Sequence, residues 1–194
     1  MFNLGIDLCC QKDRTEDSFK DLYNSIDSEC INSDNICIEK QSQNDFTLKT
    51  NKNFEKDDLL FQIRAENILT LNSLGNESPL KKAISNDKML SAMPNVSLAL
   101  ILLSLRVNIN QKNVPKKQNQ DFKLAMKWKA YLNVLPSEFN TPIFFSLNEI
   151  FQLKGAQCFG DIINHIKFIV RQYAYIFNLL DSNQQVSKIY LINI

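Results

Sequence analysis

The sequence is poor in glycine and has a single histidine, and both shortages exclude classes of site. Its four glycines, Gly5, Gly75, Gly155 and Gly160, are scattered, so neither a P-loop nor a G-x-G-x-x-G nucleotide motif is present. A base or metal role for His165 would need a nucleophile or further ligands from elsewhere in the chain. The five cysteines form no C-x-x-C pair, which favours reduced structural thiols. The residues alone therefore supply no catalytic set and no metal site.

The chain also lacks a charge excess, a long apolar run and a signal peptide. It carries 22 Lys and Arg against 21 Asp and Glu, a net charge of +1, which argues against a nucleic acid partner. Its longest apolar run, Val96–Leu105, is about half as long as a bilayer span. Residues 1–13 have no positively charged region of the kind that opens a signal peptide. We therefore expect a cytoplasmic protein, with the nucleus as the alternative, and no membrane partner.

Enough apolar residues remain for a core, since 44% of the 194 residues are hydrophobic. The first third of the chain is polar and is broken by short apolar clusters. Their alternation predicts short edge strands at Ile36–Ile38 and Phe46–Leu48. Leu59–Ile63 is the best strand candidate.

Two shorter helices are predicted on either side of these strands. Asp17–Tyr23 has apolar residues at helical spacing, with Asp17 or Ser18 as the cap. Further on, Asn86 or Asp87 caps a helix whose Met89, Leu90 and Met93 face inward. Pro94 then either kinks this helix or begins a new one, and Leu98–Leu105 anchors the core.

The second half of the chain is interpreted as a polar loop followed by helices. The lysine-rich stretch Asn108–Lys129 is expected to be a solvated loop. Ser146 and Glu149 form a capping box that starts a helix through Leu153. Asp161–Leu180 is the strongest helix, with an apolar stripe that is expected to face the core. The members of this stripe are Ile162, Ile166, Ile169, Tyr173, Phe177 and Leu180.

Three blocks carry a resemblance to a known family. They are Asp87–Leu103, Trp128–Phe145 and Val170–Phe177, and they include the segments Leu-Pro-Ser-Glu-Phe-Asn-Thr-Pro and Arg-Gln-Tyr-Ala-Tyr. In this order they resemble the SET-domain methyltransferases of the actin-histidine N-methyltransferase type. The resemblance implies an α+β fold, in which the start of a SET β-fold precedes a mostly helical insert and the C-terminus is incomplete.

The same resemblance implies a division of the chain. Residues 1–13 would be an N-terminal extension and residues 14–85 the N-terminal part of the SET domain. Residues 86–185 would be the helical insert, with a variable lysine-rich loop at 108–127, and residues 186–194 lie outside the resemblance. On this interpretation the catalytic residues lie beyond Ile194, and the chain is a truncated N-terminal fragment without activity of its own.

The resemblance assigns S-adenosylmethionine as the cofactor. Asn44, Asp45 and Phe46 fall where the family has a Glu-Gly-Phe turn that contacts this molecule. Asp45 replaces a glycine whose freedom at positive φ lets the backbone approach the ligand, so we expect a weaker contact here. Arg14 is the best match to the family's cofactor arginine, although Thr15 occupies the direct equivalent.

On the substrate side, the resemblance implies that Arg171 and Gln172 line a groove that takes an actin peptide. Arg171 would otherwise simply solvate its helix, as long charged side chains usually do. The pair Asn164–His165 is not identified with the family's Asn-His pair, because it lies inside the insert helix and the family's pair follows the insert.

The expected activity is therefore methyl transfer from S-adenosylmethionine to a histidine of actin, by a monomer. A non-catalytic interaction fragment and a protein-lysine methyltransferase of the same subclass remain the alternatives.

Overall fold

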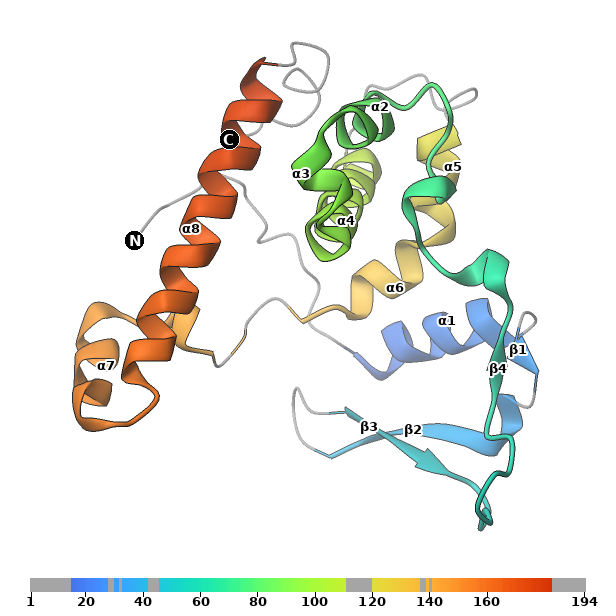
Figure 1. The fold of residues 1–194 in the computed structure, drawn as a ribbon. Helices are drawn as coiled ribbons and strands as arrows, with labels where there is room; N and C mark the ends of the chain where they lie inside the picture. Colours follow the sequence, from blue (N-terminus) through green and yellow to red (C-terminus); the bar gives the residue numbers. More distant parts are fainter. Residues whose placement is uncertain are drawn as a thin grey trace. The chain divides into compact units, whose positions relative to one another are not determined.

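The computed structural model describes residues 15–27, 30–31, 33–41, 46–110, 120–136, 139 and 141–182. The chain divides into two compact units (Figure 1). The N-terminal unit comprises residues 11–135, and the C-terminal unit comprises residues 1–10 and 136–194. Each unit is described by itself below.

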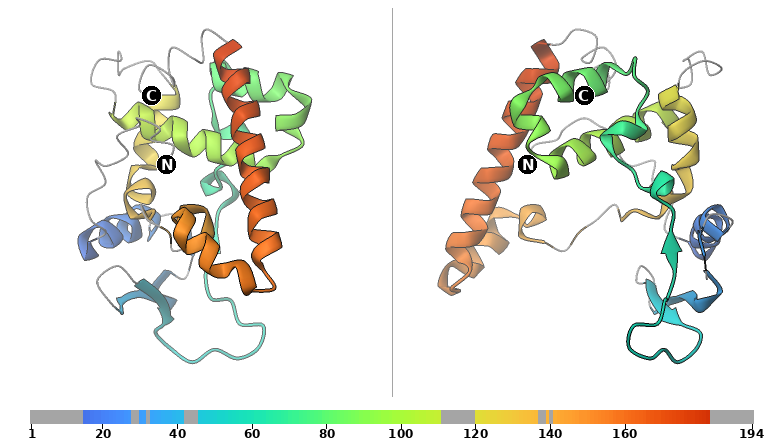
Figure 2. Two further views of the ribbon diagram at one scale, coloured as in Figure 1. Left: turned by 90° about the vertical axis from the view of Figure 1, so that its left-hand side faces the viewer. Right: turned by 45° about the vertical axis from the view of Figure 1, so that its right-hand side comes forward.

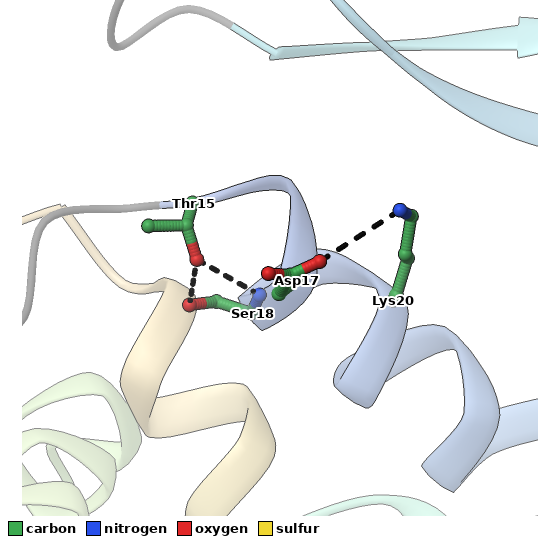
Figure 3. A network of polar contacts seen from close by, with 4 residues as sticks. All are labelled: Thr15, Asp17, Ser18 and Lys20. Atoms are coloured by element: carbon green, nitrogen blue, oxygen red, sulfur yellow. Dashed lines mark hydrogen bonds and ion pairs between the residues drawn. The ribbon is translucent and has the colours of Figure 1, made fainter.

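Helix α1 (Glu16–Asp27) opens the described part of the N-terminal unit. The amide N–H of Ser18 donates to Thr15 Oγ1 at 3.2 Å, and the two hydroxyls lie 3.0 Å apart (Figure 3). Thr15 therefore satisfies a free amide of the first turn. The expected cap at Asp17 or Ser18 is wrong, although the amphipathic helix itself is confirmed and is longer than predicted. Asp17 instead forms an exposed ion pair with Lys20 at 3.7 Å.

Two small antiparallel sheets follow α1. Strands β2 (Ile36–Lys40) and β3 (Phe46–Thr50) pair as a hairpin, which confirms both predicted edge strands. The second sheet pairs β1 (Cys30–Ile31) with β4 (Gln62–Ile63).

The prediction of a full strand over Leu59–Ile63 is only partly right. β4 contains just the last two of these residues. The carbonyls of Leu59 and Leu60 accept hydrogen bonds from the side chain of Asn35, at 3.5 and 2.9 Å, instead of from a neighbouring strand. An amide side chain thus replaces the ladder at this position, and the exposed side chains of Leu59–Phe61 face solvent.

Short 3₁₀ turns lead from the sheets into a helical core. These turns are η2 (Ala65–Asn67) and η3 (Leu71–Ser73), whereas η1 (Ser33–Asn35) lies between β1 and β2. The helices are α2 (Pro79–Asn86), α3 (Lys88–Ser91), α4 (Pro94–Asn110), α5 (Gln120–Lys127) and α6 (Lys129–Val134). Helix α4 contacts α3, α5, α6 and η3, so it is the centre of this packing (Figures 1 and 2).

The junction of α3 and α4 resolves the alternatives left open at Pro94. Asp87 caps α3 by accepting the amide of Leu90 at 2.8 Å, as predicted. A new helix then begins at Pro94, where the missing amide of proline costs no hydrogen bond. The hydroxyl of Ser97 reaches back to the carbonyl of Leu90 at 2.9 Å and ties the two helices together. Met89 is 54% exposed, so its predicted inward orientation is wrong.

Large side chains from several helices close the core of the N-terminal unit. Leu90 and Leu105 have no exposed surface, and Ile101 is 1% exposed. Burying a side chain of this kind stabilises the folded state by about 1.5–3 kcal/mol. The further core members are Leu74, Leu80, Ala83, Ile84, Leu100, Ala125, Leu132 and Val134.

The lysine-rich stretch is not simply a loop. Residues 111–119 lie outside the described part of the chain, but residues 120–127 form helix α5. Asp121 on this helix is buried and accepts the amide N–H of Gly75 at 3.1 Å. This contact, together with buried Ala125, docks α5 on the core, so the loop prediction is wrong for this part.

The described part of the C-terminal unit contains one long helix, α8 (Phe159–Ser182), and three shorter elements, η4 (Pro142–Phe144), α7 (Leu147–Gln152) and η5 (Leu153–Gly155) (Figure 2). Helix α8 contacts η4 and η5, and α7 contacts η5. The capping box is confirmed. Ser146 Oγ accepts the amide of Glu149 at 3.4 Å, and Glu149 Oε2 accepts the amide of Ser146 at 2.7 Å.

Helix α8 matches the strongest predicted helix and begins two residues earlier than expected. Its predicted inward stripe is only partly correct. Leu180 is buried and Ile162, Ile166 and Ile169 are half-buried, whereas Tyr173 and Phe177 are exposed. None of the helices in the described ranges is both long enough and apolar enough to cross a bilayer.

Candidate functional site

Phe46 is the one predicted cofactor residue that the structure describes. Arg14, Asn44 and Asp45 lie outside the described residues. Phe46 is the first residue of β3 and pairs with Lys40 of β2. Its side chain is half-buried, so part of the ring stays open to solvent.

A ring contact places the start of β3 next to α1. The ring centroids of Phe19 and Phe46 lie 4.0 Å apart, with 30° between the ring planes. Phe19 is one turn into α1, and Thr15 at the start of this helix directly follows Arg14 in the chain. The segment that follows Arg14 and the segment that follows Asp45 are therefore neighbours in the fold.

The hydrogen bonds of Thr15 and Ser18 keep the first turn of α1 regular at this point (Figure 3). Glu16 and Asp17 also stand in the first turn, where negative charge is favourable to the helix dipole. Since all four residues drawn in Figure 3 belong to α1 or its cap, this network stabilises the helix itself.

The far end of the hairpin is held by amide side chains. Asn51 donates from its backbone to the carbonyl of Asn35 at 3.0 Å and from Nδ2 to the carbonyl of Asp34 at 2.8 Å. Asn35 in turn holds the carbonyl of Leu60 at 2.9 Å. Polar contacts therefore fix the Thr50 end of β3, while the Phe19 ring contacts its Phe46 end.

The predicted substrate residues, Arg171 and Gln172, lie in the C-terminal unit on α8. Arg171 is exposed and Gln172 is half-buried. Consecutive residues of a helix point about 100° apart, so the two side chains leave α8 in different directions. The guanidinium of Arg171 has the exposure that contact with a peptide would require.

Asn164 and His165, which were not assigned to the site, are both exposed on α8. Among the described residues, no group of three or more His, Cys, Asp or Glu side chains is arranged to hold a metal ion. Cys37 and Cys158 are free thiols.

The sequence did not identify two features of this structure. Phe19 is one of the apolar residues at helical spacing in its predicted helix, and its partner Phe46 could not be inferred from that spacing. Arg106 of α4 is half-buried, and burial lowers the pKa of its guanidinium. No local sequence signal distinguishes this arginine from a surface residue.

Comparison with known proteins agrees with the resemblance of the three blocks. The chain is 31% identical over 175 residues to a protein of Danio rerio named actin-histidine N-methyltransferase, a match that covers 90% of this chain and 26% of that protein. Proteins of the same name from Gallus gallus and Homo sapiens are 27% and 26% identical over 176 residues, or 91% of this chain and 27% of each relative.

No protein-family model matches the chain, so the SET domain stays a prediction. The chain spans about a quarter of the length of the curated relatives that it matches. Over nine-tenths of its own length, it is similar to proteins named actin-histidine N-methyltransferase.

Proposed function

We propose that this chain belongs to a protein that transfers a methyl group from S-adenosylmethionine to a histidine of actin, and that the chain alone does not carry out the transfer. The observation that carries the proposal is the similarity to proteins named for this activity over nine-tenths of the chain. We further propose that residues 14–85 belong to the N-terminal part of a SET domain and residues 86–185 to its helical insert. The mixed architecture of two small sheets followed by helices is compatible with this division.

Arg14, Asn44, Asp45 and Phe46 form the proposed cofactor side. When bound, S-adenosylmethionine supplies a methyl group on a positively charged sulfur. The half-buried ring of Phe46 offers an apolar surface at the start of β3, and Arg14, just before α1, offers a cation that suits the carboxylate of the cofactor. The contact of Phe19 with Phe46 supports this assignment, because it brings the chain segments after Arg14 and Asp45 together.

Arg171 and Gln172 form the proposed substrate side. An exposed guanidinium presents several N–H donors that suit carbonyl and carboxylate oxygens of a peptide. Gln172 offers both a donor and an acceptor. The contribution of these residues is orientation: the imidazole nitrogen must be neutral and aligned with the methyl group, in a pocket without water.

A domain exchange tests the proposal directly. The 175 residues of the Danio rerio protein that match this chain are replaced by this chain. We expect the hybrid to form methylhistidine on actin, as read by mass spectrometry of actin peptides. Methyl-lysine without methylhistidine would favour the lysine alternative, and no methylation of actin by a folded hybrid would defeat the proposal.

A matched pair of variants of the same hybrid tests the substrate side. Arg171→Ala should raise the KM for actin about tenfold or more, because it removes charged hydrogen bonds to the peptide. Lys167→Ala, also exposed on α8, is the control and should leave the KM unchanged. Equal effects of the two variants would remove Arg171 from the substrate side.

A further inference from the structure

We infer that Phe19 is a positioning residue for the proposed cofactor site: its ring holds Phe46 at the start of β3. This inference rests on the proposed function, because Phe46 is assigned to the cofactor side only there. Phe19 is not expected to touch the cofactor. It acts through Phe46.

The rings of Phe19 and Phe46 are closely packed. Aromatic pairs in proteins usually have centroids about 4.5–7 Å apart. The 4.0 Å between Phe19 and Phe46, with planes only 30° apart, means that the rings lie largely face to face. Any displacement of one ring therefore moves the other or opens a gap beside it.

The exposure of the two rings also suits a binding site. Both rings are half-buried, so neither belongs to the closed core of the N-terminal unit. The pair keeps part of its surface open while the face between the rings is excluded from water. A ring that is both fixed and partly open is the arrangement that a binding residue needs.

The helix that carries Phe19 is itself held in place. Helix α1 packs on α6, and α6 supplies buried Leu132 and Val134 to the core. Thr15 caps the first turn of α1 at the end nearest Phe19. Phe19 is thus mounted on an element connected to the core.

The hairpin needs such a support at this end. A two-stranded hairpin by itself is at best marginally stable in water. Asn35 and Asn51 tie the Thr50 end of β3 by hydrogen bonds, and Phe19 contacts the Phe46 end. Loss of the Phe19 ring should therefore loosen the Phe46 end and leave the Thr50 end in place.

Two measurements on the complete 194-residue chain test the inference. The first is backbone amide exchange along β2 and β3 by NMR. The second is the shift of the Phe46 amide signal at one concentration of S-adenosylmethionine far below the dissociation constant, where the shift is inversely proportional to that constant. The variants are Phe19→Leu, which keeps an apolar group without a ring, and Phe19→Tyr, which keeps the ring.

In Phe19→Leu we expect amide exchange about tenfold faster near Phe46, unchanged exchange near Thr50 and a ligand-induced shift about tenfold smaller. In Phe19→Tyr both the exchange rate and the ligand-induced shift should equal those of the unmodified chain. The control is Phe177→Leu, which removes one ring of the exposed Tyr173–Phe177 pair, at 6.3 Å, and should change neither value. Unchanged exchange in α4 confirms that each variant is folded.

The possible failures are distinct. A ligand-induced shift in the unmodified chain that Phe19→Leu does not reduce would overturn the inference and leave the proposed function standing. A similar loss in Phe19→Tyr would also overturn it, because the ring would then not be what matters. Absence of any shift in the unmodified chain, up to the solubility limit of the ligand, would overturn the assignment of Phe46 to the cofactor side and the inference with it.

Discussion

The helical core of the N-terminal unit and the C-terminal unit differ in how they treat apolar side chains. In the first, α4 buries Leu100, Ile101 and Leu105. In the second, Ile150 and Leu180 are buried, but Leu147 is 73% exposed and eight other large apolar side chains are also exposed. The other exposed apolar residues of this unit are Phe139, Ile143, Phe144, Phe151, Phe168, Val170, Tyr173 and Phe177.

The difference follows from the number of neighbouring elements rather than from sequence pattern. α4 and α8 are both rich in apolar residues, and α8 has the more regular stripe. α4 contacts three helices and a 3₁₀ turn, whereas within its own unit α8 contacts the short elements η4 and η5. A short element covers only part of a 24-residue helix. Helical periodicity therefore predicts which face can be buried, and packing partners decide whether it is buried.

The largest effect is expected for Leu105→Ala in α4. Leu105 has no exposed surface, so truncation removes apolar contacts and leaves a cavity in a core that cannot fully collapse. We expect a loss of about 2–5 kcal/mol in the free energy of unfolding, measured by denaturant titration. Leu98→Ala on the same helix is the control, because Leu98 is 38% exposed and should cost clearly less. Equal losses would show that the core is less closed than the structure indicates.

An intermediate effect is expected for Asp121→Ala in α5. The substitution leaves the amide of Gly75 without the carboxylate oxygen that it donates to at 3.1 Å. The contact is partly buried and an unsatisfied buried donor costs about 1–3 kcal/mol, so we expect a loss of about 1 kcal/mol in the free energy of unfolding, measured by denaturant titration. Asp121→Asn keeps an oxygen acceptor at the same place and should recover most of this loss. If Asn is as damaging as Ala, the hydrogen bond to Gly75 is not what docks α5.

Features encoded by local signals could be predicted from the sequence. The hairpin strands were indicated by alternation, and the Ser146–Glu149 box and the Asp87 cap by residue types at fixed spacing. Each of these depends on residues within one turn or on side chains of one strand. The long helix α8 was equally clear, because its apolar stripe repeats over many turns.

Features that depend on distant residues could not be predicted. Helix α5 is docked through Gly75, far from Asp121 in the sequence, and a lysine-rich composition gave no sign of it. The proposed cofactor side shows the same limit. Phe46 was placed on a strand, but its contact with Phe19 joins two elements that no periodicity relates. For Arg171, the apolar stripe predicted the helix, whereas the exposure of the side chain is seen only in the structure.

A smaller and pH-dependent effect is expected at the capping box of α7. Hydrogen bonds from the side chain and backbone of Ser146 lower the pKa of Glu149 below its usual value. A carboxyl with a lowered folded-state pKa stabilises the fold above its unfolded pKa, and this is lost as the pH falls through the folded value. Below a pH of about 4 we therefore expect weaker protection of the Ser146 amide, that is, faster exchange relative to the intrinsic rate at the same pH.

Two variants separate the charge from the cap. Glu149→Gln keeps an oxygen acceptor but cannot titrate in this range, so the protection of the Ser146 amide, relative to its intrinsic exchange rate, should become independent of pH. Ser146→Ala removes the hydroxyl that accepts the amide of Glu149 and should cost about 1 kcal/mol of local helix stability. A pH dependence that persists in Glu149→Gln would assign the effect to another carboxyl.

The smallest effect is expected for Phe151→Ala, and it tests the comparison most directly. Phe151 is 63% exposed on α7, so its removal takes away little buried surface and should change the free energy of unfolding by about 0.5 kcal/mol or less. Gln152→Ala, the exposed polar neighbour on the same helix, is the control for helix propensity. Binding of a dye that recognises exposed apolar surface should fall for Phe151→Ala and stay constant for Gln152→Ala. A loss of stability comparable to that of Leu105→Ala would mean that Phe151 is buried in solution, and the two units would then no longer differ in how they treat apolar side chains.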